Sequence, residues 1–440
     1  MNAQQMLCQR SWVIFAIRSP QPEWETPRID RVGRFWDIVV MVALLTAAPA
    51  AVQASHTTMV NNGPSANRVD IVFLGDAYTA ADLNTSYVTH ISSMLTHMFN
   101  EGQDPYPRYT NFFNVHRINV VSNEQGADVP PNNIFRDTAL DATYYFDGVT
   151  ERLLYFDETK ANNALTTGLS DASFGAEIRL VTVNDARYGG GGGSYAVYAG
   201  ANSSATEVAL HELGHSFNRL ADEYGGNPNA YTGPEPSEIN VTTDPTGAKW
   251  AHWLGHSEPS FGLIGAYEGA RYHDLGLFRP SLDSKMRSLD RPFDAISREK
   301  IVLDIYGLVD PLDSWLDNSS LLIDPAELAI DVIDPGVINV NWFVNGNLVG
   351  GATDETFRLS DFGFGPGSYE VTARAFDNNP DWVRINPEQL EQSITWSVVQ
   401  TGARTVPEQS DSLTLLLGVL VLLGCAQRCG KRGKSGLASH

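Results

Sequence analysis

Three residues of one short segment have the types and spacing to bind a metal ion and act on a water molecule. His211, Glu212 and His215 stand in the order His-Glu-x-x-His at the start of HELGHSFNRLADEY, residues 211–224. On a helix, residues four apart lie on one face, so both imidazoles could reach the same ion. Glu212 would lie beside them, where it could take a proton from a water at the metal. The pattern is typical of zinc peptidases, and the plainer alternative is a helix with two surface histidines.

A catalytic zinc needs a third protein ligand. It could be a Glu on a later helix, or a residue that returns after a sharp turn. In the common form of the second arrangement, glycine is the eighth residue from the first His and a ligand is the eleventh. Here these positions hold Asn218 and Ala221. Asparagine tolerates the left-handed turn, so we expect the bend at Asn218, but alanine cannot bind metal. The third ligand is therefore predicted at Asp222, with Glu223 as the alternative; other histidines could also serve, less economically, and these are His252, His256 and His273.

The elements around this segment must position it. Ser204 and Glu207 have the S-x-x-E spacing of a capping box, which predicts a helix that begins at Ser204. The apolar face of this helix would be buried, and it consists of Leu210, Leu213 and Phe217. Just upstream, Gly189–Gly193 reads as a flexible loop, or else as a loop beside an edge strand that a substrate backbone could approach.

The wider pattern predicts a layered α/β domain. Apolar runs indicate strands at residues 69–74, 114–122 and 176–185, and helical spacing follows the first of them. A further helix is expected over residues 297–310. From about Ser314 the sequence changes to short strands separated by turn residues, which predicts an all-β, immunoglobulin-like sandwich.

Both ends of the chain read as sorting signals. Near the start, an apolar run follows Arg31 and Arg34 and ends in small residues, so we expect a signal peptide cleaved after Ala54. Near the other end, Val406–Glu408 precedes an apolar run over residues 413–426, which is shorter than a spanning helix needs, and basic residues follow. This order resembles the PEP-CTERM sorting signal of Gram-negative bacteria, and a plain tail anchor is the alternative. The predicted organisation is a leader (residues 1–54), a catalytic domain (55–315), a β-sandwich (316–402) and a sorting signal (403–440).

The net charge and the positions of the cysteines exclude some kinds of partner and of metal site. The formal net charge of −22 makes nucleic acid and anionic membrane surfaces poor partners. The only cysteines are Cys8, Cys425 and Cys429, all outside the predicted domains, so a thiolate metal site or disulfide framework is excluded there.

The motif HELGHSFNRLADEY resembles that of the bacterial IgA-peptidase family of zinc metalloproteases, a metzincin-like group. The segments that carry the resemblance further are DIVFLGDAYTAAD, PYPRYTNFFNVHRINVVSNEQGAD, VNDARYGGGGG, FRPSLDSKMRS and NWFVNGNLVGG. The resemblance covers most of residues 65–400 and implies a metzincin-like fold. It also implies a methionine-containing turn (Met-turn) under the zinc at Met286, although a plain core methionine is the alternative. Some members carry cysteines near this turn, where this chain has Ser284 and Asp294.

The resemblance and the residues together imply roles at the site. His211, His215 and Asp222 would hold one Zn²⁺, and Glu212 would be the general base for a water that the zinc activates. Glu223 would orient a histidine if it is not the third ligand. Tyr224 would either stabilise the oxyanion or act as a core wedge. The substrate would lie extended along the strand after the glycines and extend the sheet.

The chain is therefore expected to be a secreted zinc-dependent endopeptidase that acts on protein or peptide substrates. One alternative is a surface-binding or adhesive protein with a vestigial protease domain, and another is a zinc amidase acting on cell-wall peptides. The terminal signals imply contact with export and sorting machinery, a transient membrane association through the C-terminal segment, and a location at the envelope surface or outside a Gram-negative cell.

Overall fold

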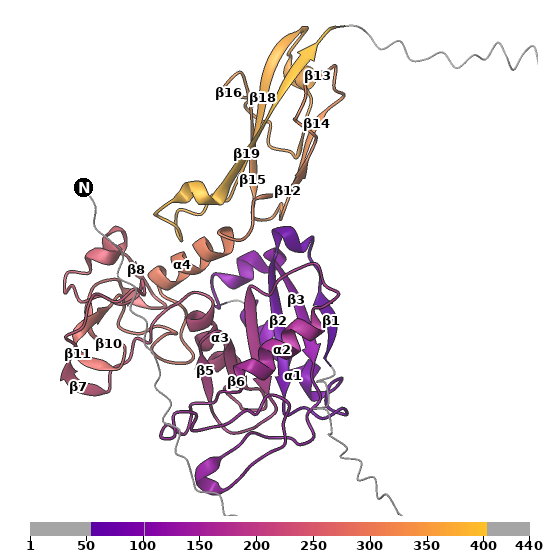
Figure 1. Ribbon diagram of the computed structural model, residues 1–440. Coiled ribbons are helices and arrows are strands. Elements are labelled where there is room, and N and C mark those ends of the chain that lie inside the picture. Colours follow the sequence, from indigo (N-terminus) through magenta and orange to yellow (C-terminus); the bar gives the residue numbers. More distant parts are fainter. Residues whose placement is uncertain (1–53, 101, 403–440) are drawn as a thin grey trace, which may run out of the picture. The chain divides into compact units, whose positions relative to one another are not determined.

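Strand β2 (Val69–Asp76) is buried along its whole length, and a mostly parallel six-stranded sheet forms around it (Figure 1). The computed structural model describes residues 54–100 and 102–402. The sheet order is β1-β3-β2-β4-β6-β5, in which only the edge strands β1 and β5 run antiparallel to their neighbours. The other strands of this sheet are β1 (Ser55–Val60), β3 (Phe113–Asn119), β4 (Ile178–Val183), β5 (Gly190–Gly192) and β6 (Ala196–Ala199).

Side chains that alternate along β2 build a separate core on each face of the sheet. Ile71 and Phe73 pack in one cluster with helices α1 (Ser86–Met98) and α3 (Ala205–Ser216). Val72 and Leu74 pack in another cluster with α2 (Glu158–Gly168). Because successive strand residues point to opposite faces, one apolar run fills both cores. The predicted mixed α/β layer is confirmed, and α3 lies on the face that it shares with α1.

The glycine run is ordered as a strand, so its interpretation as a flexible loop is wrong. Gly190–Gly192 forms the edge strand β5 and pairs antiparallel with β6. The predicted substrate edge also needs correction. Strand β6, which follows the glycines, lies inside the sheet, and β5 takes the outer position.

The segment between α3 and α4 (Ala295–Tyr306) contains two small sheets. One of them has the order β10-β11-β7 and the other pairs β8 with β9. Their strands are β7 (Asn227–Ala230), β8 (Ser257–Glu258), β9 (Gly262–Leu263), β10 (Tyr267–Ala270) and β11 (His273–Arg279).

The C-terminal part is rich in strands, arranged in sheets of order β12-β14-β17 and β13-β19-β18-β15-β16. The predicted boundary at 315/316 falls after β12, which pairs with β14 and thus belongs to this part. Strand β17 is short, and a 3-10 helix follows it at Leu359–Phe362. The strands are β12 (Leu312–Trp315), β13 (Leu322–Ile323), β14 (Leu328–Val332), β15 (Asn339–Val344), β16 (Asn347–Leu348), β17 (Thr356–Phe357), β18 (Gly367–Phe376) and β19 (Glu391–Gln400).

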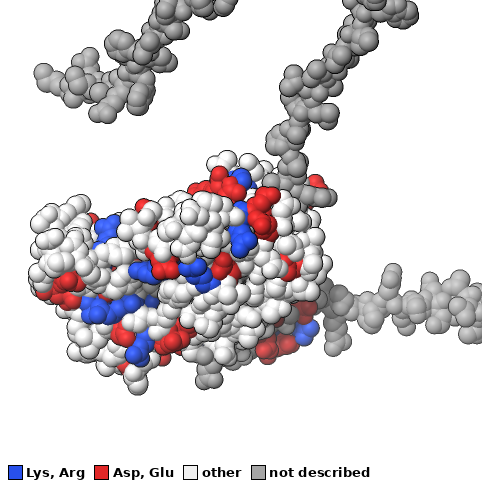
Figure 2. All heavy atoms as spheres, turned by 90° about the horizontal axis from the view of Figure 1, so that it is seen from below, with Lys and Arg blue, Asp and Glu red and all other residues white. Residues whose placement is uncertain are grey.

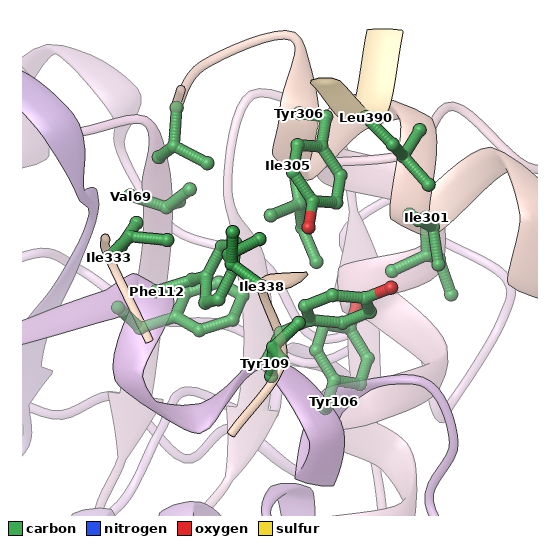
Figure 3. Packing of buried hydrophobic residues seen from close by; sticks show 14 of the residues in the cluster. Val69, Tyr106, Tyr109, Phe112, Ile301, Ile305, Tyr306, Ile333, Ile338 and Leu390 are labelled. Carbon is green, nitrogen blue, oxygen red and sulfur yellow. The ribbon is translucent and has the colours of Figure 1, made fainter. Parts of the chain in front are cut away.

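One hydrophobic core continues from the α/β layer into the strand-rich part. Figure 3 shows Tyr109 and Phe112 close to Tyr306 of α4 and Ile338, with Leu390 nearby. Polar contacts reinforce this junction, because Asp377 accepts hydrogen bonds from Arg108 (2.5 Å) and from the Tyr109 hydroxyl (2.7 Å). A cut at the predicted boundary would therefore expose core residues on both sides.

The predicted sorting signals fall outside the described residues. This applies to the leader up to the expected cleavage point at Ala54, to the C-terminal signal over residues 403–440, and to all the cysteines. Among the described residues, no helix combines the length and apolar character that crossing a membrane requires.

Candidate metal centre

Helix α3 presents His211 and His215 side by side, each fixed by a backbone carbonyl. The Nδ1 atom of His211 lies 2.8 Å from the carbonyl oxygen of Lys285, and Nδ1 of His215 lies 2.6 Å from that of Leu220. A carbonyl oxygen can only accept, so both Nδ1 atoms must carry hydrogen. In the neutral rings this leaves the lone pairs on the Nε2 atoms, which face each other at 3.2 Å.

Asp222 completes a group of three possible ligand atoms. Its Oδ1 atom lies 3.1 Å from Nε2 of His211 and 3.2 Å from Nε2 of His215. Ligands about 2.0–2.2 Å from a tetrahedral zinc stand roughly 3.3–3.5 Å apart, so small shifts would bring these atoms to coordination distance. Two imidazoles and one carboxylate suit zinc, and the open side of the group faces a cavity of about 500 Å³.

Contacts within the group shift the pKa values of Asp222 and His215 in opposite directions. Burial alone would raise the pKa of Asp222, but hydrogen bonds from His211 and His215 outweigh it and hold that pKa well below its usual range. Burial disfavours the charged form of His215, yet the hydrogen bond and charge of Asp222 raise the pKa of His215 to about 9. Without metal the site therefore keeps a proton on His215 at neutral pH, and a cation would have to displace it.

The chain turns after the second histidine, but not at the predicted residue. Arg219 adopts the left-handed conformation (φ 55°), and Asn218 does not. The side chain of Asn218 is wholly buried, where it donates to Asp304 (2.8 Å) and accepts from the Tyr106 hydroxyl (3.3 Å). Asn218 thus anchors the end of α3 in the core and leaves the turn to its neighbour.

The predicted capping box does not form. Ser204 is the N-cap residue of α3, but its side chain makes no capping bond. Glu207 instead points into the core, where its carboxylate accepts from Lys285 Nζ (2.7 Å) and from the backbone N–H of Asp290 (2.8 Å). Leaving the buried Lys285 without a carboxylate would cost more free energy than a local cap contributes, so Glu207 pairs with the lysine.

Glu223 does not contact either histidine, so its predicted role in orienting a histidine is wrong. The Glu223 carboxylate is buried and accepts from Ser284 Oγ (2.6 Å) and from Asn240 Nδ2 (2.9 Å). Its backbone N–H donates to the carbonyl of Met286 (2.8 Å). Glu223 therefore ties the irregular segment that contains Asp222 to residues 284–286, where Ser284 supplies a hydrogen bond.

Met286 is fully buried beneath α3. A Cβ atom built on Gly214 would lie only 2.6 Å from Met286 Sδ, so glycine at this position permits the close packing. The side chain therefore packs directly against the helix turn that carries His211 and His215, and its assignment to a Met-turn stays a prediction.

Glu212 faces the cavity and has no hydrogen-bond partner among the described residues. Its two carboxylate oxygens lie 3.1 Å from the positions that Cβ atoms on Gly190 and Gly192 would occupy. A larger residue at Gly190 or Gly192 would collide with α3, which explains glycine at these two positions. Burial raises the pKa of Glu212 above its usual range.

Sequence reasoning missed Tyr272 and Arg152. The Tyr272 hydroxyl donates to Asp222 Oδ2, and its ring lies 5.3 Å from that of Tyr224. The Arg152 guanidinium lies 5.8 Å from the centre of the Tyr224 ring, and both residues line the cavity. Tyr272 is brought in by a β10–β11 turn in which Arg271 and Tyr272 take left-handed conformations, a feature that neither residue type signals in the sequence.

The remaining candidate ligands lie elsewhere. His252 is bonded to Glu299, His256 to Glu258, and His273 lies near the carbonyl of Asn229. None of these histidines lines the cavity at α3.

Residues 57–262 match the family model for IgA Peptidase M64. The matched segment contains the whole α3 motif, and Met286 lies beyond it. No curated protein sequence matches the chain.

Proposed function

The chain belongs to the IgA peptidase M64 family over residues 57–262, and on that basis we propose that it is a zinc-dependent endopeptidase. Family membership implies a peptidase that uses a metal. The observation that carries the finer proposal is the close grouping of His211, His215 and Asp222 beside the unpaired carboxylate of Glu212. In this proposal the three grouped residues hold one Zn²⁺ and Glu212 is the general base.

Each residue has a defined task in the proposed reaction. Bound zinc would supply Lewis acidity and lower the pKa of a coordinated water to about 7. Glu212 removes the proton from the attacking water and then delivers it to the leaving amine. The raised pKa of Glu212 suits both steps, because a stronger base accepts the proton more readily. Lys285 and Leu220 keep the histidine rings oriented through their carbonyl groups.

Tyr224 is the proposed donor to the oxyanion that forms on the scissile carbonyl. Burial raises the pKa of Tyr224 to about 12, so its hydroxyl keeps its proton at neutral pH and can donate. Tyr272 has a different task, since its hydroxyl is engaged by Asp222 and holds that carboxylate in place.

A substrate backbone would pair with the outer edge of β5 at Gly192. The Gly190 N–H donates to Arg152 O (3.1 Å) and the Gly190 carbonyl accepts from Leu154 N–H (3.2 Å), so this part of the edge is covered. Backbone groups alternate in direction along an antiparallel strand, which turns those of Gly192 outward as well. No described backbone group pairs with them on that side, and they lie at the cavity. The predicted extension of the sheet therefore moves to β5, with Gly192 as the pairing residue.

The other parts of the chain complete the proposal. We propose an immunoglobulin-like sandwich for the strand-rich part, supported by Trp342 and Trp396, which stack in its core at 5.7 Å. Export and a location at the envelope surface or outside the cell remain proposals that rest on the terminal sequences.

Hydrolysis by metal-free and zinc-reconstituted protein tests the proposal. The full chain should be used, because its core runs through both parts. Zinc should restore cleavage of casein to protein depleted with a chelator. Cleavage of cell-wall peptides alone would favour the amidase, and no hydrolysis at a full zinc content would favour an adhesive protein with a vestigial protease domain.

A further inference from the structure

The cleft beside α3 carries arginines that lack an acidic partner, and we propose that the enzyme selects polypeptide segments with Asp or Glu on both sides of the bond it cuts. This inference rests on the proposed peptidase function and adds the class of substrate. It is carried by four arginines, which are Arg152, Arg179, Arg219 and Arg287.

Most basic side chains in the described residues are neutralised by a carboxylate. Those that form no ion pair with a described carboxylate are Arg117, Arg152, Arg179, Arg219, Arg279, Arg287 and Arg384. Three of them are satisfied in other ways. Arg117 and Arg279 are buried and donate to backbone carbonyls, and Arg384 lies 3.8 Å from the centre of the Trp253 ring. The remaining four all line the cleft.

These four arginines line two neighbouring cavities beside α3. Arg152 and Arg287 line the cavity of about 500 Å³ that contains His211, Glu212 and Asp222. Arg179 and Arg219 line a second cavity of about 450 Å³. Gly193 and His215 line both cavities, so the two meet at the end of the edge strand. A peptide paired with Gly192 would therefore have arginines near its residues on either side of the metal group.

The contacts of these arginines leave their charge available. The Arg287 guanidinium donates to the carbonyl of Glu223 (3.2 Å). The guanidinium of Arg179 lies 5.3 Å from the ring centre of Tyr195, and that of Arg152 lies 5.8 Å from the ring centre of Tyr224. Aromatic rings and carbonyl oxygens orient a guanidinium without neutralising it.

Acidic groups at the cleft do not cancel this charge. Glu238 is paired with Arg271, the third arginine that lines the first cavity (3.3 Å). Glu177, in the second cavity, forms no ion pair with Arg179 or Arg219, and its single charge is outnumbered by theirs; it accepts a hydrogen bond from the backbone N–H of Asp70 (2.9 Å). Asp222 and Glu212 belong to the metal group itself.

The unpaired arginines stand out against the charge of the whole chain. The formal net charge is −22, so acidic ligands would be repelled by the average surface. Figure 2 shows basic and acidic side chains intermixed on the face seen from below, so individual surface regions differ from that average. Local arginines can therefore attract a carboxylate at short range, because salt screens charges more than about 10 Å away. An extended acidic segment fits better than a globular acidic surface, since only an extended chain can pair with Gly192.

Binding of a peptide pair to the zinc-loaded Glu212→Gln full chain tests the inference apart from turnover. One peptide alternates Glu and Ala and carries a fluorescent label, and the other has Gln in place of every Glu. We expect the Glu peptide to bind about tenfold more tightly at low salt, with most of this preference lost in 1 M salt. Arg219→Gln and Arg287→Gln should each reduce the preference by about twofold and the double variant by about fourfold, because Arg152 and Arg179 remain.

The control variant is Arg358→Gln, an exposed arginine of the strand-rich part that pairs with Glu327. It should keep the full preference. Equal affinity of the Glu212→Gln chain for the two peptides, or an undiminished preference in the double variant, overturns the inference. Failure of this inference differs from failure of the proposed function. If the unmodified protein cleaves both peptides at equal rates, it is a peptidase without an acidic preference. If the protein binds the Glu peptide selectively but cleaves neither peptide, acidic recognition is supported and the peptidase function is not.

Discussion

The imidazole of His211 donates a 2.8 Å hydrogen bond to the carbonyl oxygen of Lys285, a residue 74 positions further along the chain. Lys285 directly precedes Met286, and its ammonium group returns to α3 through Glu207 at 2.7 Å. Two contacts therefore join α3 to Lys285: the hydrogen bond from His211 and the ion pair with Glu207. This arrangement connects the orientation of one proposed ligand to a buried ion pair.

Replacing Glu207 by Gln should destabilise the protein and loosen the metal group. Hydrogen bonds from His97 and Lys285 outweigh burial and lower the pKa of Glu207 to about 2. Burial also lowers the pKa of Lys285, so the lysine's desolvation offsets part of the benefit of the pair. Loss of the carboxylate alone leaves that lysine uncompensated, and we expect a cost of about 3 kcal/mol by denaturant unfolding together with about tenfold weaker zinc binding.

The matched control is the double variant Glu207→Gln/Lys285→Met, which removes the buried charge as well as its partner. It should recover at least half of the lost stability. If the double variant is less stable than Glu207→Gln alone, the pair does not stabilise the site in the way described.

Asp222→Ala should lower zinc affinity at least 100-fold, because it removes one of the three grouped ligand atoms. Glu223→Ala should weaken zinc binding far less, since Glu223 contacts Ser284 and Asn240 and neither histidine. Competition with a fluorescent zinc chelator measures both constants. The opposite ranking would transfer the third-ligand role to Glu223.

Glu223→Gln should change how stability depends on pH. Burial, with the nearby charge of Asp294, raises the pKa of Glu223 well above its ordinary value of 4.5. The folded protein therefore keeps a proton that the unfolded chain releases above about pH 4.5. This contribution is fully present below that pH and is lost as pH rises toward the folded-state pKa.

The glutamine variant has no such proton to lose, so its free energy of unfolding should rise relative to that of the unmodified protein between pH 5 and pH 8. The expected change is on the order of 1 kcal/mol per pH unit while Glu223 holds its proton only in the folded state. Denaturant unfolding of the metal-free proteins measures it. A difference that stays constant over this range would show that Glu223 is already ionised in the fold.

Gly192→Ala should weaken zinc binding and cleavage because the added methyl group would collide with His215. The added Cβ would lie 2.6 Å from Cβ of His215, a distance at which the strand or the helix has to move. We expect at least tenfold weaker zinc binding and a loss of cleavage. Gly350→Ala is the control, because nothing lies within 4 Å of its added Cβ. Unchanged zinc affinity in Gly192→Ala would mean that β5 does not press on the α3 motif as closely as described.

Much of the layout follows from local sequence patterns. The buried run at β2 and the spacing of His211 and His215 depend on neighbours a few residues away, and both gave the right element. The possible ligand atoms of the three side chains grouped from the sequence, one from each residue, do lie within 4.8 Å of one another, although their role as ligands stays a prediction.

The misjudged features depend on distant partners. Glu207 had the spacing of a capping residue, but a lysine 78 positions away takes its carboxylate. Asn218 suited a left-handed turn, yet Asp304 and Tyr106 hold its side chain in the core. Tyr272 reaches Asp222 only because a hairpin turn brings it there. No short window of sequence contains such partners.

The most direct test of the central claim is peptide hydrolysis by the Glu212→Gln full chain, measured with its zinc content. The amide cannot accept the proton of the attacking water, whereas the grouped atoms of His211, His215 and Asp222 are unchanged. We predict one zinc per chain and a fall in kcat/KM of at least about 1,000-fold, with the unmodified protein as the reference. Turnover close to that of the unmodified protein at the same zinc content would contradict the account.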